Sequence, residues 1–302
     1  MFRLSSPHPG QSGYDVVPDT RPGVADKRRL FRELHLSGCF VIPNPWDPGS
    51  ARYLQSLGFK ALATTSSGFA WSQGRCDYGI SRDRALTHFA AMVEATDVPI
   101  NADFQNGFAH DPAGLAESIA LAIDTGVAGI SIEDSTGDPA SPLYPAELAA
   151  ARIRAAREAI ERKGGDTLLV ARAECFLVGR PDIEETVARL KDYADAGADC
   201  LYAPGIRQSG DILRVVERVA PKPVNLLVGF PSPLTVSQIA ALGVRRISVG
   251  GALARCAWSG FMRAATALAQ GGSFEGFRES ASGDALDSLM REPQAGAPAP
   301  RG

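Results

Sequence analysis

Charged side chains end three short apolar runs that follow one another along the chain. Asp103 and Glu133 each close such a run, and Arg172 closes the next one. Carboxylates bind hard divalent cations, and a guanidinium binds a carboxylate or phosphate through two parallel hydrogen bonds. These residue types predict metal-assisted chemistry on an anionic substrate, provided that the fold brings the three ends together.

Strand-like and helix-like segments alternate along the chain, which is typical of a parallel sheet. Eight units favour an α/β fold closed into a (β/α)8 TIM-type barrel, whose active site is built from the C-terminal ends of the strands. A doubly wound sheet would normally carry a glycine-rich fingerprint after its first strand, and this chain has none there. The predicted strands span residues 39–43, 60–65, 98–103, 127–133, 167–172, 199–203, 223–228 and 244–249.

The barrel is expected to occupy residues 23–273. Its first segment, residues 24–37, has apolar positions at helical spacing and predicts a helix that closes the bottom of the barrel. Residues 1–22 are predicted to form an irregular arm, and residues 274–302 a C-terminal helical extension with a disordered tail. Residues 66–79 are predicted to be a loop.

Composition excludes several classes of partner. The chain has 302 residues with a formal net charge of −3, and no long basic run, so nucleic acid is not an expected partner. No apolar run approaches the roughly 20 residues that a membrane helix needs, so no membrane partner is expected. The five cysteines are widely spaced and form no CxxC pair, which favours reduced thiols in a cytoplasmic protein.

The candidate metal ligands at the strand ends are all carboxylate oxygen atoms. Such ligands favour Mg²⁺, with Mn²⁺ as the alternative, over zinc. Another reading is that Asp103 and Glu133 cap the helices that follow them. Arg172 could likewise pair with Glu133 or Glu174 instead of, or in addition to, a substrate. None of the five lysines is expected at the mouth of the barrel, which disfavours a Schiff-base aldolase.

Two further groups of polar residues are candidates for substrate binding. The run Thr65, Ser66, Ser67 and Gly68 follows the second predicted strand and could present hydroxyl and N–H groups to an anion, or form a plain polar turn. Asn225 lies inside the seventh predicted strand, where a polar side chain needs a partner. That partner could be a substrate carboxylate or a neighbouring backbone carbonyl.

Seven segments, in order, resemble motifs of the isocitrate lyase/phosphoenolpyruvate mutase superfamily over about residues 26–270. Each is weak alone, but their order on the predicted strand ends is specific. They are Asn44-Pro-Trp-Asp-Pro-Gly, Thr65-Ser-Ser-Gly-Phe-Ala, Asp77-Tyr-Gly-Ile, Asp103-Phe-Gln-Asn-Gly-Phe, Ile132-Glu-Asp, Ala171-Arg-Ala and Val224-Asn. The resemblance implies a barrel whose C-terminal helix is swapped between subunits, usually in homotetramers built as dimers of swapped dimers.

The resemblance also implies Mg²⁺ and a small oxo acid as ligands. Asp103 would hold the metal directly, while Asp77 and Glu133 would hold metal-bound waters. Gln105 is also implied as a metal-site residue. It stands where the family has a second aspartate in its metal motif, and the replacement removes one negative charge. The residues implied as catalytic are Arg172, Asp77 and Glu133. The residues implied to contact the substrate are Thr65, Ser66, Ser67, Gly68, Arg172 and Asn225, the last of them at its distal group.

One departure from the superfamily narrows the expected activity. The segment 135–144 lacks the loop cysteine that serves isocitrate and methylisocitrate lyases as acid/base, and it lacks the lysine and asparagine of the mutases. Tyr144 and His110 are candidates for a replacement acid. The branch without the cysteine includes oxaloacetate decarboxylases, whose reaction needs only an electrophile to stabilise an enolate.

We therefore expect a metal-dependent carbon–carbon lyase, of the carboxy-lyase or oxo-acid-lyase type, that acts on a small α-keto dicarboxylic acid through an enolate. Oxaloacetate decarboxylation is the preferred reaction. One alternative is a lyase, hydrolase or mutase that cleaves a C–C or P–C bond in another oxo acid. The other is a protein that binds α-keto acids without catalysis.

Overall fold

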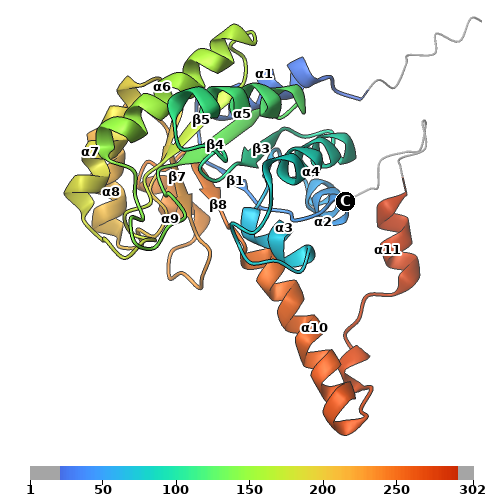
Figure 1. The fold of residues 1–302 in the computed structure, drawn as a ribbon. Coiled ribbons are helices and arrows are strands. Elements are labelled where there is room, and N and C mark those ends of the chain that lie inside the picture. Colours follow the sequence, from blue (N-terminus) through green and yellow to red (C-terminus); the bar gives the residue numbers. More distant parts are fainter. Residues whose placement is uncertain (1–20, 292–302) are drawn as a thin grey trace, which may run out of the picture. The chain divides into compact units, whose positions relative to one another are not determined.

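The computed structural model describes residues 21–291. Nearly all of the predicted N-terminal arm, and the predicted disordered tail from residue 294, lie outside them. Within them, eight parallel strands pair in the order β1-β8-β7-β6-β5-β4-β3-β2 (Figure 1). A hydrogen bond of 3.1 Å from Ala63 N to Pro43 O links the two ends of this row. The predicted (β/α)8 barrel is confirmed. Its strands are β1 Phe40–Ile42, β2 Leu62–Ala63, β3 Ile100–Asp103, β4 Gly129–Glu133, β5 Leu168–Arg172, β6 Cys200–Tyr202, β7 Val224–Leu227 and β8 Arg246–Ser248.

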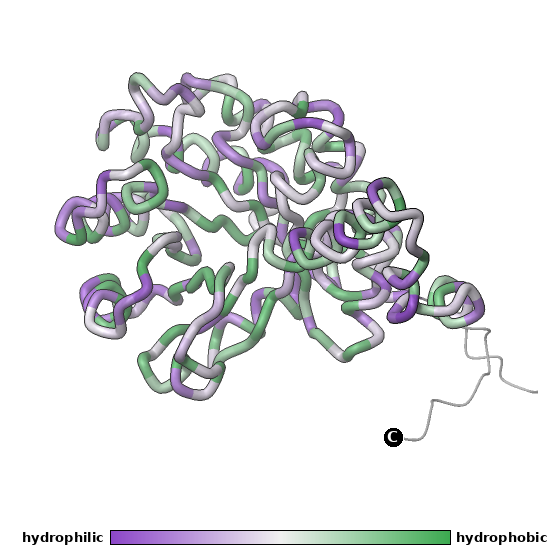
Figure 2. The backbone as a smooth tube through the Cα atoms, turned by 90° about the horizontal axis from the view of Figure 1, so that it is seen from below, coloured by the Kyte–Doolittle hydropathy of each residue, from purple (hydrophilic) through white to green (hydrophobic). Residues whose placement is uncertain are grey.

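Helices surround these strands, and most begin at a side-chain cap. Asp47, Ser81 and Asp182 each accept a hydrogen bond from a first-turn N–H group, which satisfies donors that a helix leaves open. Hydrophobic and hydrophilic residues alternate along the helices (Figure 2), as one-sided burial against a sheet requires. The helices are α2 Pro48–Ser56, α3 Ser66–Ser72, α4 Arg82–Ala95, α5 Pro112–Asp124, α6 Ala146–Arg162, α7 Ile183–Asp195, α8 Ser209–Val219, α9 Val236–Ala241 and α10 Ala252–Gly271.

The segment after β2 corrects one prediction, because α3 occupies the first seven residues of the expected loop at 66–79. Oγ1 of Thr65 accepts from Gly68 N at 3.3 Å, and Oδ2 of Asp103 accepts from Ser66 N at 2.9 Å. These two acceptors satisfy donors of the first turn. A helix this short carries too few apolar positions for its period to be read from sequence.

Strand alternation decides which side chains face the inside of the barrel. On β5, Leu168 and Val170 belong to the small apolar cluster inside the barrel, whereas Leu169 belongs to the larger core between strands and helices. Arg172 has the same parity as Leu168, so it faces inward at the C-terminal end. The same period on β4 turns Glu133 inward.

Helix α1, Val24–Leu34, closes the N-terminal end of the barrel as predicted. Phe31 is fully buried and belongs to the cluster inside the barrel. Arg28 donates to the carbonyls of Val127 at 3.0 Å and Ile123 at 2.9 Å, which fixes the helix to the region just before β4.

The C-terminal part leaves the barrel. Helix α10 extends away from the strands, and the chain returns through η1, Glu275–Phe277, to α11, Gly283–Met290 (Figure 1). Nη1 of Arg52 on α2 donates to Met290 O at 2.7 Å. The short helices expected after residue 273 are therefore present. Within residues 21–291, no helix combines the length and apolar character needed to cross a bilayer.

A buried histidine at the base of the barrel should make folding stability depend on pH. Nδ1 of His35 lies 2.7 Å from Phe31 O, and its Nε2 lies 3.4 Å from Nη1 of Arg246. Burial and the nearby Arg246 charge lower the pKa of His35 from 6.5 to about 3. Below pH 6.5, His35 binds a proton in the unfolded chain but stays neutral in the folded chain. The folded state therefore loses stability as the pH falls from 6.5 towards 3.

We predict that the change His35→Asn removes this dependence. At pH 4.5 the wild-type protein should have lost about 2–3 kcal/mol through this residue, at about 1.4 kcal/mol for each pH unit below 6.5. Urea unfolding of both proteins between pH 7 and pH 4.5 measures their free energies of unfolding. The difference between the two proteins cancels the contribution of titrating groups that both contain. Parallel pH profiles for the two proteins would show that His35 is not the cause.

Candidate active site

A cavity of about 640 Å³ opens at the C-terminal ends of the strands. Side chains from β3, β4, β5 and β8 line it, because strand alternation turns them inward there. The loop after β2 adds polar groups of its own. The polar residues that line the cavity include Thr65, Ser66, Asp103, Ser131, Arg172 and Ser248.

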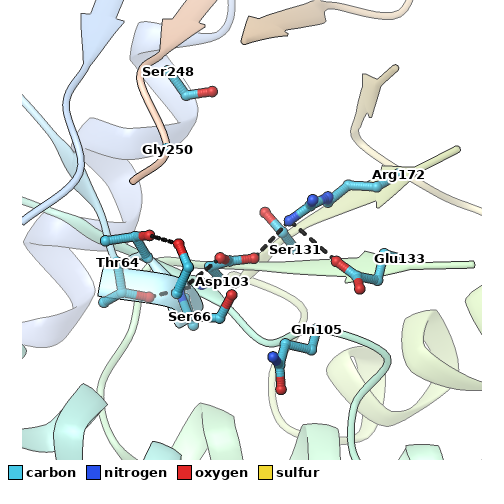
Figure 3. Close-up of polar contacts among 12 residues, drawn as sticks. Thr64, Ser66, Asp103, Gln105, Ser131, Glu133, Arg172, Ser248 and Gly250 are labelled. Atoms are coloured by element: carbon cyan, nitrogen blue, oxygen red, sulfur yellow. Dashed lines mark hydrogen bonds and ion pairs between the residues drawn. The ribbon is translucent and has the colours of Figure 1, made fainter. Parts of the chain in front are cut away.

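Arg172 joins three carboxylates at this cavity. Its Nη1 lies 2.7 Å from Oδ1 of Asp103 and 3.3 Å from Oε2 of Glu133 (Figure 3). Its Nε donates to Oε1 of Glu174 at 2.8 Å. The structure therefore brings together the three residues on which the sequence prediction rested. It also shows that Arg172 pairs with both of the glutamates considered as partners.

This cluster contains more acidic than basic groups. Burial raises the pKa of both Glu133 and Glu174, while Arg172 acts to lower both values. For Arg172 itself, burial acts to lower the pKa, but the surrounding carboxylates outweigh burial and hold it well above its usual value. One guanidinium faces three acids, so the site favours an additional cation.

Gln105 positions a fourth carboxylate, that of Asp77. Nε2 of Gln105 donates to Oδ1 of Asp77 at 3.0 Å, and Asp77 lies on the cavity wall. The backbone of Gln105 has a left-handed φ of 50°, and its carbonyl accepts from Glu133 N at 3.0 Å. The amide that replaces the family's second aspartate thus acts as a hydrogen-bond donor to Asp77.

Tyr78 is a contact that sequence reasoning missed. Its hydroxyl donates to the carboxylate of Glu133. A Cβ added to Gly137 would lie 3.2 Å from Cδ1 of Tyr78, so the loop after β4 packs against the tyrosine ring. A bridge between Ser135 and Leu143 folds that loop back on itself. Tyr78 and this loop together cover Glu133. Nothing in the spacing of residues 77–80 points to a partner on β4.

The capping alternative is wrong for both strand-end acids. Helix α5 is capped by Asp111, whose Oδ1 accepts from the N–H groups of residues 113 and 114. Helix α6 begins after Pro145 with no side-chain cap. Asp103 instead contacts the first turn of α3, which precedes it in sequence. Its position belongs to the cavity and not to the helix that follows it.

Asn225 lies behind the cavity wall. The residue is completely buried, its Nδ2 donates to Ser248 Oγ at 2.9 Å, and its Oδ1 accepts from Arg246 Nε at 2.8 Å. Both ends of the amide are engaged by β8. The expected contact with the distal group of a substrate therefore has no support in this placement, and Asn225 instead holds two residues that do line the cavity.

The two acids considered for proton donation contact each other. Nδ1 of His110 lies 2.8 Å from the hydroxyl of Tyr144, and the guanidinium carbon of Arg152 lies 4.0 Å from the centre of the Tyr144 ring. Neither residue is part of the wall described above. The structure places this pair away from the cavity.

The fold and the strand-end cluster agree with a comparison against known families. The family model described as phosphoenolpyruvate phosphomutase matches residues 31–269. The chain belongs to this family. It is thus a member of the isocitrate lyase/phosphoenolpyruvate mutase superfamily of lyases and mutases, as the motif order predicted.

Individual relatives cover most of the chain. An oxaloacetate decarboxylase of Pseudomonas putida is 29% identical over 238 residues, which is 74% of this chain and 78% of the relative. A Burkholderia cenocepacia structure described as a candidate lyase/mutase is 44% identical with a TM-score of 0.86, covering 89% of this chain and 97% of that one. Oxaloacetate acetylhydrolase in complex with oxalate is 26% identical with a TM-score of 0.79, covering 90% and 95%.

The donors in this family member fit a magnesium ion held mainly by water. Across residues 21–291, no three acidic, histidine or cysteine side chains form a ready metal cage. Mg²⁺ does not need one, because it keeps several waters and binds proteins through one or two carboxylates. Asp103 and Asp77 line the cavity. Their carboxylate oxygens are ligands of the kind that a hard divalent cation prefers, and the predicted scheme would have Asp103 bind the metal directly and Asp77 and Glu133 bind it through water.

Removing the cation of this cluster should be costly. We predict that Arg172→Met lowers the free energy of unfolding by about 3–5 kcal/mol near neutral pH, because three buried carboxylates lose their shared partner. The control is Arg214→Met, which removes an ion pair of 3.1 Å between side chains that are 50% and 60% exposed and should change stability by less than about 1 kcal/mol. Denaturant unfolding of both variants measures this, and equal losses would contradict the interpretation.

Proposed function

We propose that this protein is a Mg²⁺-dependent lyase for a small α-keto dicarboxylic acid and that it decarboxylates oxaloacetate. The observation that carries the proposal is the composition of the cavity wall. The wall contains Arg172 and several hydroxyl groups beside oxygen ligands, but neither cysteine nor lysine from residues 21–291. Loss of CO2 from a β-keto acid requires stabilisation of the enolate that forms, and this enolate then takes a proton from water at its terminal carbon to give pyruvate.

The residues of the chain have distinct parts in this scheme. Mg²⁺ bound at Asp103 would supply a Lewis acid that polarises the keto group. Arg172 faces the same region and stabilises the negative charge that develops on the keto oxygen as CO2 leaves. The hydroxyls of Ser66 and Ser67 on the wall orient the oxo acid. Tyr78 and the loop after β4 cover Glu133 and would separate this side of the site from bulk water, which a competing hydrolysis would need.

The relatives support this choice of substrate. The Pseudomonas putida relative is an oxaloacetate decarboxylase, and the acetylhydrolase of similar fold is named for oxaloacetate and was solved with oxalate. Both names describe proteins that act on a C4 oxo diacid. A polar cavity that offers guanidinium and hydroxyl groups to an anion suits such a molecule.

We predict that oxaloacetate releases CO2 in the presence of Mg²⁺ and that EDTA abolishes this release. Asp103→Ala should lower kcat/KM at least about 100-fold, because it removes the metal's direct ligand and several kcal/mol of charge stabilisation. Asp111→Ala is the matched control, since that aspartate only caps α5. Recording CO2 and the products by NMR tests the proposal.

The products also separate the alternatives. Oxalate and acetate in place of pyruvate and CO2 would indicate a hydrolase. Metal-dependent binding of oxo acids with no turnover of any of them would indicate a binding protein. Equal CO2 release by the wild-type and Asp103→Ala proteins would contradict the metal site assigned here.

We also propose that α10 is covered by another copy of this chain, in a homotetramer of swapped dimers. Phe261 and Met262 on α10 are 62% and 59% exposed, and Phe274 beyond it is 68% exposed. Of the α10 residues, Ala254 alone is buried. Several large apolar side chains exposed along one helix are typical of an interface between proteins.

Light scattering after size exclusion tests this assembly. We predict a tetramer for the wild-type protein and smaller species for Phe261→Glu, because a charge would be buried at the interface without a partner. Leu36→Glu is the control, since Leu36 is a 73% exposed apolar residue at the opposite end of the barrel. A monomeric wild-type protein, or a Phe261→Glu variant of unchanged mass, would refute the proposal.

A further inference from the structure

The floor of the cavity carries a second guanidinium, that of Arg246. Arg246 and Ser248 have the same parity on β8 and both face into the barrel. Arg246 is only 1% exposed, yet it lines the cavity together with Asn101 and Ser131. A cation buried this deeply is costly unless charge or hydrogen bonds compensate it.

Neutral groups are the only partners of Arg246 within residues 21–291. Its Nε donates to Asn225 Oδ1 at 2.8 Å, and its Nη1 lies 3.4 Å from both Asn101 Oδ1 and His35 Nε2. His35 brings no negative charge and, with its lowered pKa, is neutral at physiological pH. Nη2 of Arg246 makes no hydrogen bond to the described residues, and no described carboxylate pairs with the guanidinium.

Arg152 is a buried arginine with a structural role, and backbone carbonyls accept hydrogen bonds from its guanidinium. It is also 1% exposed, but its Nη1 donates to the carbonyls of Ala109 at 2.8 Å and His110 at 3.1 Å, and its Nη2 donates to that of Asn106. Both terminal nitrogens are therefore engaged. Arg246 differs because its terminal nitrogens have weak or no protein acceptors and lie at a cavity.

Hydroxyl groups at the floor of the cavity can donate hydrogen bonds beside Arg246. Asn101 Nδ2 donates to Ser131 Oγ at 2.9 Å, which leaves the Ser131 hydroxyl hydrogen free to donate. Ser131 lies beside Arg172, and Ser248 faces the same space from β8 (Figure 3). The cavity is thus polarised, with acids around Arg172 at its rim and an uncompensated cation with hydroxyl donors at its floor.

We propose that Arg246, assisted by Ser131, binds the carboxylate that the substrate and the product share. The proposal rests on the proposed function, because it assigns the two ends of an α-keto diacid to the two ends of one cavity. The group at Arg246 must be the retained carboxylate. A guanidinium paired with the departing carboxylate would stabilise its negative charge, which has to move to the keto oxygen as CO2 leaves, and would therefore slow the reaction.

This assignment orients the substrate. With the retained carboxylate on the floor, the keto oxygen reaches Arg172 and the departing carboxylate points to the acidic rim. An interaction with a group that does not change during the reaction strengthens substrate and transition-state binding equally. Loss of Arg246 should therefore raise KM and leave kcat nearly unchanged, whereas loss of an interaction at the keto oxygen would lower kcat.

The test uses pyruvate and its uncharged amide, pyruvamide, as probes in the presence of Mg²⁺. We expect Arg246→Gln to weaken pyruvate binding about 30-fold, as loss of a charge-assisted hydrogen bond does, and to leave pyruvamide binding unchanged. Arg246→Lys should retain part of the affinity. Arg245→Gln is the matched control, because Arg245 has the opposite parity on the same chain segment and donates to Gly38 O. Calorimetry or NMR titration gives the affinities.

Three outcomes would overturn the proposal: equal pyruvate affinity in the wild-type and Arg246→Gln proteins, equal weakening of pyruvate and pyruvamide, or no binding of pyruvate by the wild-type protein. Thermal unfolding of Arg246→Gln and Arg246→Lys identifies a variant that has lost its fold, and the lysine variant then decides. Pyruvate binding that depends on Arg246 without CO2 release from oxaloacetate would instead refute the proposed function and leave the role of Arg246 supported.

Discussion

The shared ion pairing of Arg172 is the interaction on which the rest of the site depends. A buried guanidinium and buried carboxylates are each unfavourable alone, and only their mutual contact makes the cluster stable. The structure supports it from behind, because Glu174 N donates to Oδ1 of Asp134 at 2.8 Å. Oδ2 of Asp134 in turn accepts from the Tyr193 hydroxyl at 2.6 Å and from Arg189 at 3.2 Å. Helix α7 thereby fixes the end of β5, and with it the direction of Arg172.

Sequence was sufficient to predict those features that follow from strand periodicity. Each strand end of a parallel barrel has one inward parity, so a charged residue at that position enters the cavity whatever the details of the helices. The register pairs Glu133 with Arg172 and Asp103 with Ser131, which sets the three predicted side chains side by side. The fold, the order of its elements and this cluster could therefore be predicted. The strands proved shorter than their apolar runs, because each run continues into turns.

Contacts between distant segments could not be predicted. Tyr78 reaches Glu133 across 55 positions, and Arg246 reaches Asn101 across 145, and no local pattern encodes either distance. Arg246 begins its strand, where a side chain would be assigned to the bottom of the barrel, but its length brings the guanidinium to the cavity. Asn225 has the inward parity that its position in the strand predicts. Its amide is nevertheless bound by two side chains of β8 and not directed at the cavity.

The distribution of charge is consistent with the proposed decarboxylation by a family member without a loop cysteine. During decarboxylation, negative charge moves from the departing carboxylate to the keto oxygen. Acids at the rim would raise the energy of negative charge on the departing carboxylate. Arg172 would lower the energy of negative charge on the keto oxygen. Both effects favour the charge movement of the reaction. In the proposed orientation, the cation at Arg246 would bind the carboxylate that does not react. The loss of CO2 itself needs no acid, and the enolate left behind would take a proton from water at its terminal carbon to give pyruvate.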